Sequence, residues 1–140
     1  MDKHSKEYIN NKNYILITQK AIILNDKNQI LLLRRSNRCK NAGKWNLPGG
    51  GLEKEDPTNG IIREIKEETG LDITSIKPIF TISFAEESEF VVMIGYLTKT
   101  RYKNITLNWE NDQYEWVSKE EVLSSDLSEI IKSFVKQAKI

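Results

Sequence analysis

The chain has 140 residues, with 21 Lys and Arg against 20 Asp and Glu, so its formal net charge is +1. This length suits one domain with a single core, and a composition with 39% hydrophobic and 29% charged residues excludes a wholly disordered chain. The balanced charge excludes a whole-surface preference for nucleic acid or anionic lipid, so no extended nucleic acid is expected as a partner.

The first part of the chain predicts a tail followed by two strands. Residues 1–13 are polar and lack periodicity, which is typical of a flexible N-terminal tail, so a single domain is expected over residues 14–140. Residues 14–24 and 29–35 are rich in Ile and Leu, and the polar residues 25–28 between them have the composition of a turn. The pattern predicts two strands paired as a hairpin.

A glycine triplet follows these strands. The polar residues 36–44 predict a surface loop, which leads through Trp45 into the glycines at 49–51. Glycine in regular structure costs roughly 0.5–1 kcal/mol relative to alanine, so three in a row need a reason. The triplet indicates either a flexible loop or a backbone that must pass close to a ligand.

A helix is predicted over residues 57–69, because Asp56 suits an N-cap, Pro57 the first helical position and Gly70 the C-terminal cap. Downstream we expect strands over residues 73–83, 89–97 and 114–117, a short helix after the capping box 118–121, and an amphipathic helix over residues 126–138. This order predicts an α+β fold without an internal repeat or linker.

The small numbers of cysteine and histidine residues exclude several kinds of site. Cys39 is the only cysteine and His4 the only histidine, which excludes an internal disulfide, a zinc site and a histidine-based catalytic triad. No run of about 18 apolar residues and no signal-peptide pattern occurs, so we expect no membrane partner and a cytoplasmic protein. Acid–base chemistry then falls to carboxylates, lysine or tyrosine.

The glutamates of the predicted helix are the strongest candidates for such chemistry. Glu64, Glu67 and Glu68 are spaced i, i+3 and i+4, which places them on one helix face, while Ile61, Ile62 and Ile65 form the inward stripe. Like charges at this spacing are unfavourable in isolation, although such a run is often only a solvated face. A divalent cation would turn this repulsion into attraction, because all three carboxylates could bind it. Ligands that are all oxygen favour Mg²⁺, with Mn²⁺ as the alternative.

The surrounding residues match a known signature. From Gly49 the chain reads five residues to Glu55, seven more to Arg63-Glu64-Ile65, one to Glu67-Glu68 and one to Gly70-Leu71. This resembles the signature box of the Nudix hydrolase superfamily, matched at every specified position. The resemblance implies the Nudix fold, a mixed β-sheet sandwiched between α-helices, over about residues 14–138.

The resemblance also implies roles for these residues. Glu64, Glu67 and Glu68 would hold the metal together with the backbone of Gly49, Arg63 would fix a glutamate, and either Glu64 or Glu67 would be the catalytic base. Glu55 would support the site, although Lys54 stands where many members have glycine, which leaves Glu53 as an alternative. One further carboxylate is expected from outside the box, with Glu110 as first candidate and Glu115 as second.

The implied reaction is metal-dependent hydrolysis of a nucleoside diphosphate linked to another group. Arg35 and Lys44 are candidates for binding phosphates, Trp45 for binding the base, and Gly50 and Gly51 for close approach to the substrate. Elimination favours a MutT-like nucleoside triphosphate pyrophosphohydrolase that releases a monophosphate and pyrophosphate. The alternatives are hydrolysis of coenzyme A or of an RNA 5′ end, and a Nudix domain that senses a nucleotide without cutting it. A homodimer is a further option that the resemblance implies.

Overall fold

The computed structural model describes residues 14–86 and 89–140, so the predicted tail over residues 1–13 lies outside the described part. One mixed sheet contains the strands β1 (Ile15–Leu24), β2 (Ile30–Arg35), β3 (Trp45–Asn46), β4 (Gly49–Gly51), β5 (Lys77–Glu86), β6 (Glu89–Lys99) and β7 (Asn111–Val117). The helices are α2 (Pro57–Thr69), α3 (Lys119–Ser124) and α4 (Glu129–Gln137). No helix in these ranges is long and apolar enough to cross a membrane.

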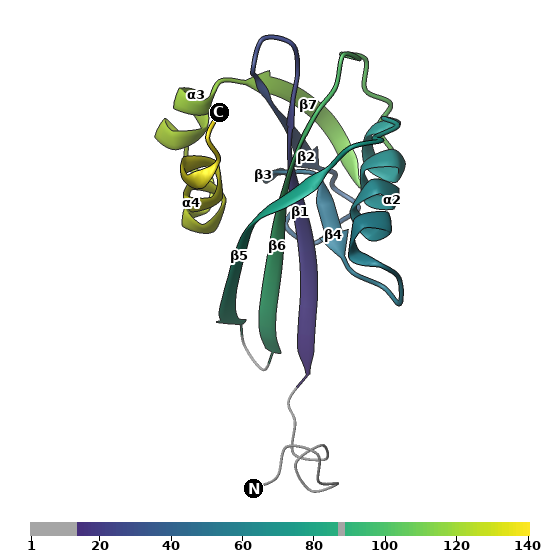
Figure 1. The fold of residues 1–140 in the computed structure, drawn as a ribbon, viewed down its shortest axis with the longest axis vertical. Helices are drawn as coiled ribbons and strands as arrows, with labels where there is room; N and C mark the ends of the chain where they lie inside the picture. The colour runs from purple at the N-terminus through teal and green to yellow at the C-terminus, as the bar shows by residue number, and fades with distance from the viewer. Residues whose placement is uncertain (1–13, 87–88) are drawn as a thin grey trace, which may run out of the picture.

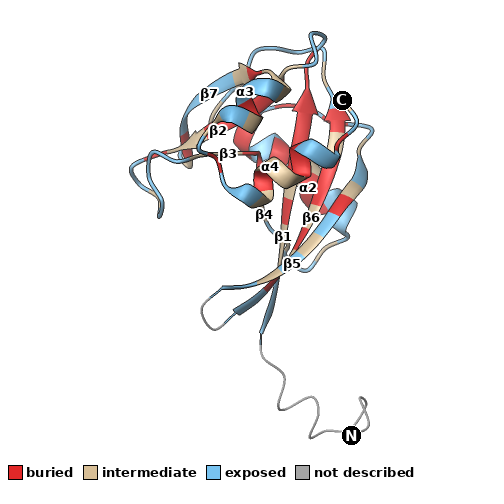
Figure 2. Ribbon diagram, turned by 90° about the vertical axis from the view of Figure 1, so that its left-hand side faces the viewer, coloured by how far each residue is buried: buried red, intermediate tan, exposed pale blue. Residues whose placement is uncertain are grey.

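The helices cover the sheet from both sides, with α2 on one face and α3 and α4 on the other (Figure 1). Alternate residues of β1 therefore enter two separate cores: Ala21 and Ile23 pack toward α2, and Ile22 and Leu24 toward α4. The buried residues are concentrated where helices face the sheet, while the free ends of β1, β5 and β6 extend beyond the helices and are exposed (Figure 2). The predicted α+β sandwich is confirmed.

The predicted hairpin is correct only at its turn. β1 and β2 pair at Leu24 and Ile30 and then diverge. β1 continues beside β6 in parallel and beside β4, whereas β2 pairs with β7 and β3. The second half of β1, from Ala21 to Leu24, and residues 30–33 of β2 are buried, so each strand gains from neighbours that cover it more than a two-stranded ribbon would. The divergence opens the sheet between β1 and β2.

Other element boundaries differ from the prediction for local reasons. The strand expected over residues 73–83 begins only at Lys77, because Ile73 is buried in the core beneath α2 while its backbone is irregular. The glycines at 49–51 form the strand β4, not a loop. The last helix begins at Glu129, since Ser128 and not Asp126 is its N-cap, although Leu127 is buried as expected.

The caps of the other two helices are as predicted. Asp56 accepts hydrogen bonds from the backbone N–H groups of Thr58 and Asn59, and Gly70 ends α2 in the left-handed conformation with φ 77°. Ser118 and Glu121 form the reciprocal capping box that begins α3. These short-range signals fix where α2 and α3 begin and where α2 ends.

Candidate active site

Helix α2 is anchored by its apolar side and turns its glutamates toward β4. Ile61 and Ile65 are completely buried, whereas Ile62, predicted to share their stripe, is only partly buried. The fixed rotation of the helix brings Glu64 and Glu68 against the glycine strand and leaves the side chain of Glu67 49% exposed. The three glutamates predicted to act together therefore lie in different environments.

Glu68 is a buried carboxylate held by two donors. The backbone N–H of Gly49 donates to its Oε1 at 3.0 Å, and Asn111 Nδ2 donates to its Oε2 at 3.1 Å. Only 4% of the residue is exposed, and this burial raises the pKa of Glu68 to about 7, against the opposing effects of the Lys20 charge and the Gly49 N–H. A buried carboxylate with a raised pKa gains from a nearby cation.

The glycine triplet fits around these glutamates. A Cβ on Gly49, where φ is 144°, would collide with the Gln19 carbonyl of β1, and a Cβ on Gly50 would lie 2.9 Å from the Glu64 carboxylate. Gly51 has open space beside it. Gly49 is thus required by the close approach of the β1 backbone, and Gly50 lies against the flexible end of Glu64, whereas the close approach to a ligand stays a prediction.

Arg63 links the glutamates by charge-assisted hydrogen bonds. It donates from Nε and Nη2 to both carboxylate oxygens of Glu55, at 2.8 and 2.7 Å, and its Nη1 lies 3.2 Å from Glu67 and 3.3 Å from Glu64. The bidentate contact lowers the pKa of Glu55 and raises that of Arg63. Glu53, the alternative supporting residue, contacts Glu55 through its backbone: its N–H donates to the Glu55 carboxylate and its carbonyl accepts from the Glu55 N–H.

The two candidates outside the signature box lie in different places. Glu110 stands just before Asn111, accepts a hydrogen bond from the side chain of Asn108, and is close enough to raise the pKa values of Glu64 and Glu68. Glu115 pairs with Leu32, whose side chain packs in the core beneath α3 and α4. The geometry therefore favours Glu110.

These carboxylates do not form a ready-made cage. Within residues 14–86 and 89–140, no three acidic, histidine or cysteine side chains converge closely enough to hold a metal as they stand. The donor set is nevertheless suitable for Mg²⁺, because it consists of carboxylate oxygens, one of them on the buried Glu68 with its raised pKa. Glu67 is exposed and free to turn from Arg63 toward a cation.

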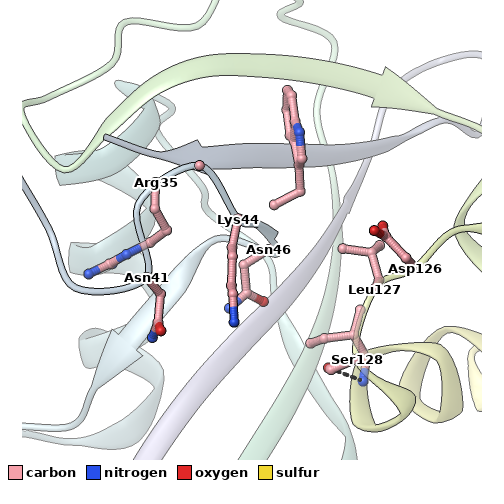
Figure 3. A pocket seen from close by; sticks show the side chains of 10 residues that line it. Arg35, Asn41, Lys44, Asn46, Asp126, Leu127 and Ser128 are labelled. Carbon is pink, nitrogen blue, oxygen red and sulfur yellow. Dashed lines mark hydrogen bonds between the residues drawn. The ribbon is translucent and has the colours of Figure 1, made fainter. Parts of the chain in front are cut away.

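A cleft of about 590 Å³ lies between the segment 41–46 before β4 and residues 126–131 at the start of α4 (Figure 3). Its walls carry three of the five residues predicted to bind substrate, Arg35, Lys44 and Trp45, whereas Gly50 and Gly51 do not line it. Asp126 and Ser128, at the start of the C-terminal helical segment, lie on the opposite side of the cleft from Lys44 (Figure 3). The cleft thus combines cations, an aromatic ring and polar groups, as a nucleotide requires.

Sequence reasoning missed two residues of this region. Lys20 of β1 is half-buried and donates to the carbonyl of Leu47 at 3.4 Å, and burial lowers its pKa although the charge of Glu68 opposes the change. The only available signal was a lysine within an apolar strand. Asn111 is buried on Glu68, and nothing in its local sequence indicates a partner 43 residues away.

Comparisons with known proteins agree with this geometry. The model of the NUDIX domain family matches residues 17–138. Nucleoside triphosphatase NudI from Enterobacter sp. (strain 638) is 31% identical over 120 residues, which cover 77% of this chain and 85% of the relative. An 8-oxo-dGTP diphosphatase from Proteus vulgaris is 29% identical over 85 residues, 60% of this chain and 75% of that protein. The crystal structure of a MutT protein from Methanosarcina mazei Go1 superposes with a TM-score of 0.80 and 31% identity, covering 90% of this chain and 94% of the other.

Proposed function

The chain belongs to the NUDIX domain family, and on this premise we propose that it is a pyrophosphohydrolase that cleaves nucleoside triphosphates into a monophosphate and pyrophosphate. The observation that carries the proposal is the buried Glu68, which β4 and Asn111 hold within electrostatic reach of Glu64 and Glu110. Relatives named nucleoside triphosphatase and 8-oxo-dGTP diphosphatase support a triphosphate as substrate.

Members of this family generally need divalent cations, and we propose Mg²⁺ for this chain, with Mn²⁺ as a substitute. Glu64, Glu67 and Glu68 would hold it together with the carbonyl of Gly49, and Glu110 would complete the set. A bound cation neutralises phosphate oxygens and lowers the pKa of the water that attacks phosphorus. The oxygen-only donor set and the raised pKa values of Glu64 and Glu68 support this assignment.

The other residues position substrate and protons. Arg63 holds Glu55 and keeps Glu67 within reach of the cluster. We assign the general base to Glu64 or Glu67, and the raised pKa of Glu64, caused by burial, favours Glu64 because a base works best with a pKa nearer neutrality. Arg35 and Lys44 would bind the negatively charged phosphate oxygens through their positive charges, and Trp45 would stack against the nucleobase of the substrate.

The test is a phosphate-release assay with added pyrophosphatase, in which the protein and Mg²⁺ meet a panel of nucleoside triphosphates, oxidised purine triphosphates, coenzyme A and 5′-triphosphorylated RNA. We expect turnover of a triphosphate, with monophosphate identified by chromatography. Glu67→Gln and Glu68→Gln should each lower kcat at least 100-fold at unchanged circular dichroism, whereas Glu120→Gln, at an exposed position of α3, should not. Full activity of both variants, or turnover of coenzyme A or RNA alone, would contradict the proposal.

Two further predictions from the sequence stay proposals. A cytoplasmic location and a homodimer are both compatible with the family, and sedimentation velocity on the purified protein tests the second directly. The proposed reaction needs neither, because every residue assigned to it lies in one chain.

A further inference from the structure

Lys20 occupies an unusual place in the sheet. It pairs with Gly49 of β4 on one side and with Gly95 of β6 on the other, so neither neighbouring strand places a side chain beside it. The ring of Phe134 from α4 fills the space above Gly95, where a Cβ would lie only 2.6 Å from the ring. Of the three residues paired side by side here, Gly49, Lys20 and Gly95, the lysine is therefore the only one with a side chain.

The ammonium group of Lys20 is poorly satisfied by the protein. Among the residues that the structure describes, its hydrogen-bond partner is the carbonyl of Leu47 at 3.4 Å, and no carboxylate lies within ion-pair distance. An ammonium carries three donors, so a half-buried lysine in this state has capacity for a further acceptor. The charges of Glu68, Glu64 and Arg35 all act on this ammonium group.

The surface around Lys20 continues the substrate cleft. A smaller cavity of about 270 Å³ is lined by Lys20 and Thr18 of β1, and it shares Asn46, Ser128 and Ile131 with the 590 Å³ cleft. The two hollows thus form one groove. Lys20 lines the smaller hollow and is near enough to Glu68 and Glu64, and to Arg35 of the larger cleft, for their charges to act on it.

We propose that Lys20 is a further substrate-binding residue, whose ammonium group binds a phosphate oxygen of the polyphosphate chain where that chain passes the carboxylate cluster. The inference rests on the proposed function. A polyphosphate that approaches Glu64 and Glu68 meets negative charge, and Lys20 supplies a positive charge on the cleft side that no carboxylate of the described residues neutralises by direct contact. Half-burial strengthens such a contact relative to one made by an exposed lysine.

The proposal is tested with inorganic pyrophosphate and a non-hydrolysable α,β-methylene nucleoside triphosphate, titrated by calorimetry into the full-length protein at saturating Mg²⁺. We expect Lys20→Met to weaken both ligands about tenfold or more, the usual size of one charge-assisted hydrogen bond. Lys20→Arg should recover most of the loss. Lys27→Met, at the exposed turn after the same strand, is the matched control and should bind as the wild type does. In turnover, KM should rise more than kcat falls.

The outcomes separate this inference from other roles of the lysine. Unchanged pyrophosphate affinity in Lys20→Met overturns it, and so does a wild-type protein that does not bind pyrophosphate. If Lys20→Met alters only the affinity for Mn²⁺, followed by electron paramagnetic resonance, Lys20 acts on the carboxylates and the inference is wrong. A wild type that binds pyrophosphate through Lys20 without hydrolysing any triphosphate would support the contact and refute the proposed activity. Thermal unfolding of each variant confirms that it is folded.

Discussion

Glu68→Gln should change how the stability of the metal-free protein depends on pH. The pKa of Glu68 is about 7 in the folded chain against 4.5 as a reference, so its ionisation works against folding. At 1.36 kcal/mol per pH unit, this group contributes stability that is fully present below pH 4.5 and is lost progressively up to pH 7, with a total loss of about 3 kcal/mol. Glutamine cannot ionise and removes that loss.

The substitution is well suited to its surroundings. Both partners of Glu68 are donors, the backbone N–H of Gly49 and Nδ2 of Asn111, and glutamine retains one acceptor while the amide of Asn111 can turn to accept from its NH₂ group. Lys20, Glu64 and Glu110 also face this carboxylate and remain in the variant. The difference between wild type and variant therefore reports Glu68 itself.

The assay is urea unfolding in EDTA at pH 5 and pH 8. From pH 5 to pH 8 the free energy of unfolding of the wild type should fall about 2–3 kcal/mol further than that of Glu68→Gln. Glu67→Gln, whose carboxylate is exposed, is the control and should follow the wild type. At pH 8, Mg²⁺ should stabilise the wild type but not Glu68→Gln. Parallel pH dependences of wild type and Glu68→Gln would refute the reasoning.

The remaining predictions concern the backbone of β4 and the arginine of α2. Gly49→Ala should destabilise the fold by about 2–4 kcal/mol, because its Cβ would collide with the Gln19 carbonyl at a φ that disfavours side chains. Gly51→Ala should change the free energy of unfolding by less than about 0.5 kcal/mol. Urea unfolding compares the two variants, and equal losses of stability would contradict the steric argument. Arg63→Lys should lower kcat about tenfold or more with little change in KM, since an ammonium cannot make the two parallel hydrogen bonds to Glu55. Steady-state kinetics measures both constants, and a kcat equal to that of the wild type would show that the bidentate contact is not needed.

Helix α2 and the identity of its glutamates could be predicted because their signals are local. Asp56 and Gly70 terminate the helix through bonds to backbone atoms within four residues, and the spacing of the glutamates fixes their relative rotation. The spacing could not predict that the three glutamates differ in how deeply they are buried. Glu68 is buried because β4 and Asn111 approach it, and these contacts span 19 and 43 residues of sequence.

The strands were harder to predict than the helix for the same reason. Ile73 is apolar and buried in an irregular segment, so its sequence has the composition of a strand without the pairing. The glycines at 49–51 have poor strand propensity, yet they pair with β1, and at Gly49 a Cβ would collide with the Gln19 carbonyl. Lys20 gave only the signal of a lysine within an apolar strand, since the groove that it faces is made by residues from five elements: β1, β3, β5, β6 and α4 with its N-cap.

The parallel pairing of β1 with β6 bears on the order in which the molecule folds. It joins Ile15 to Phe90 and continues to Leu24 and Lys99, so a loop of about 75 residues must close before β1 acquires its neighbour. Helix α2 and its glutamates lie within that loop. Contacts so distant in sequence form slowly, typically in milliseconds to seconds for domains rich in them. A nascent chain whose β6 has not yet left the ribosome therefore lacks the β1–β6 pairing of the sheet against which α2 and its carboxylates pack.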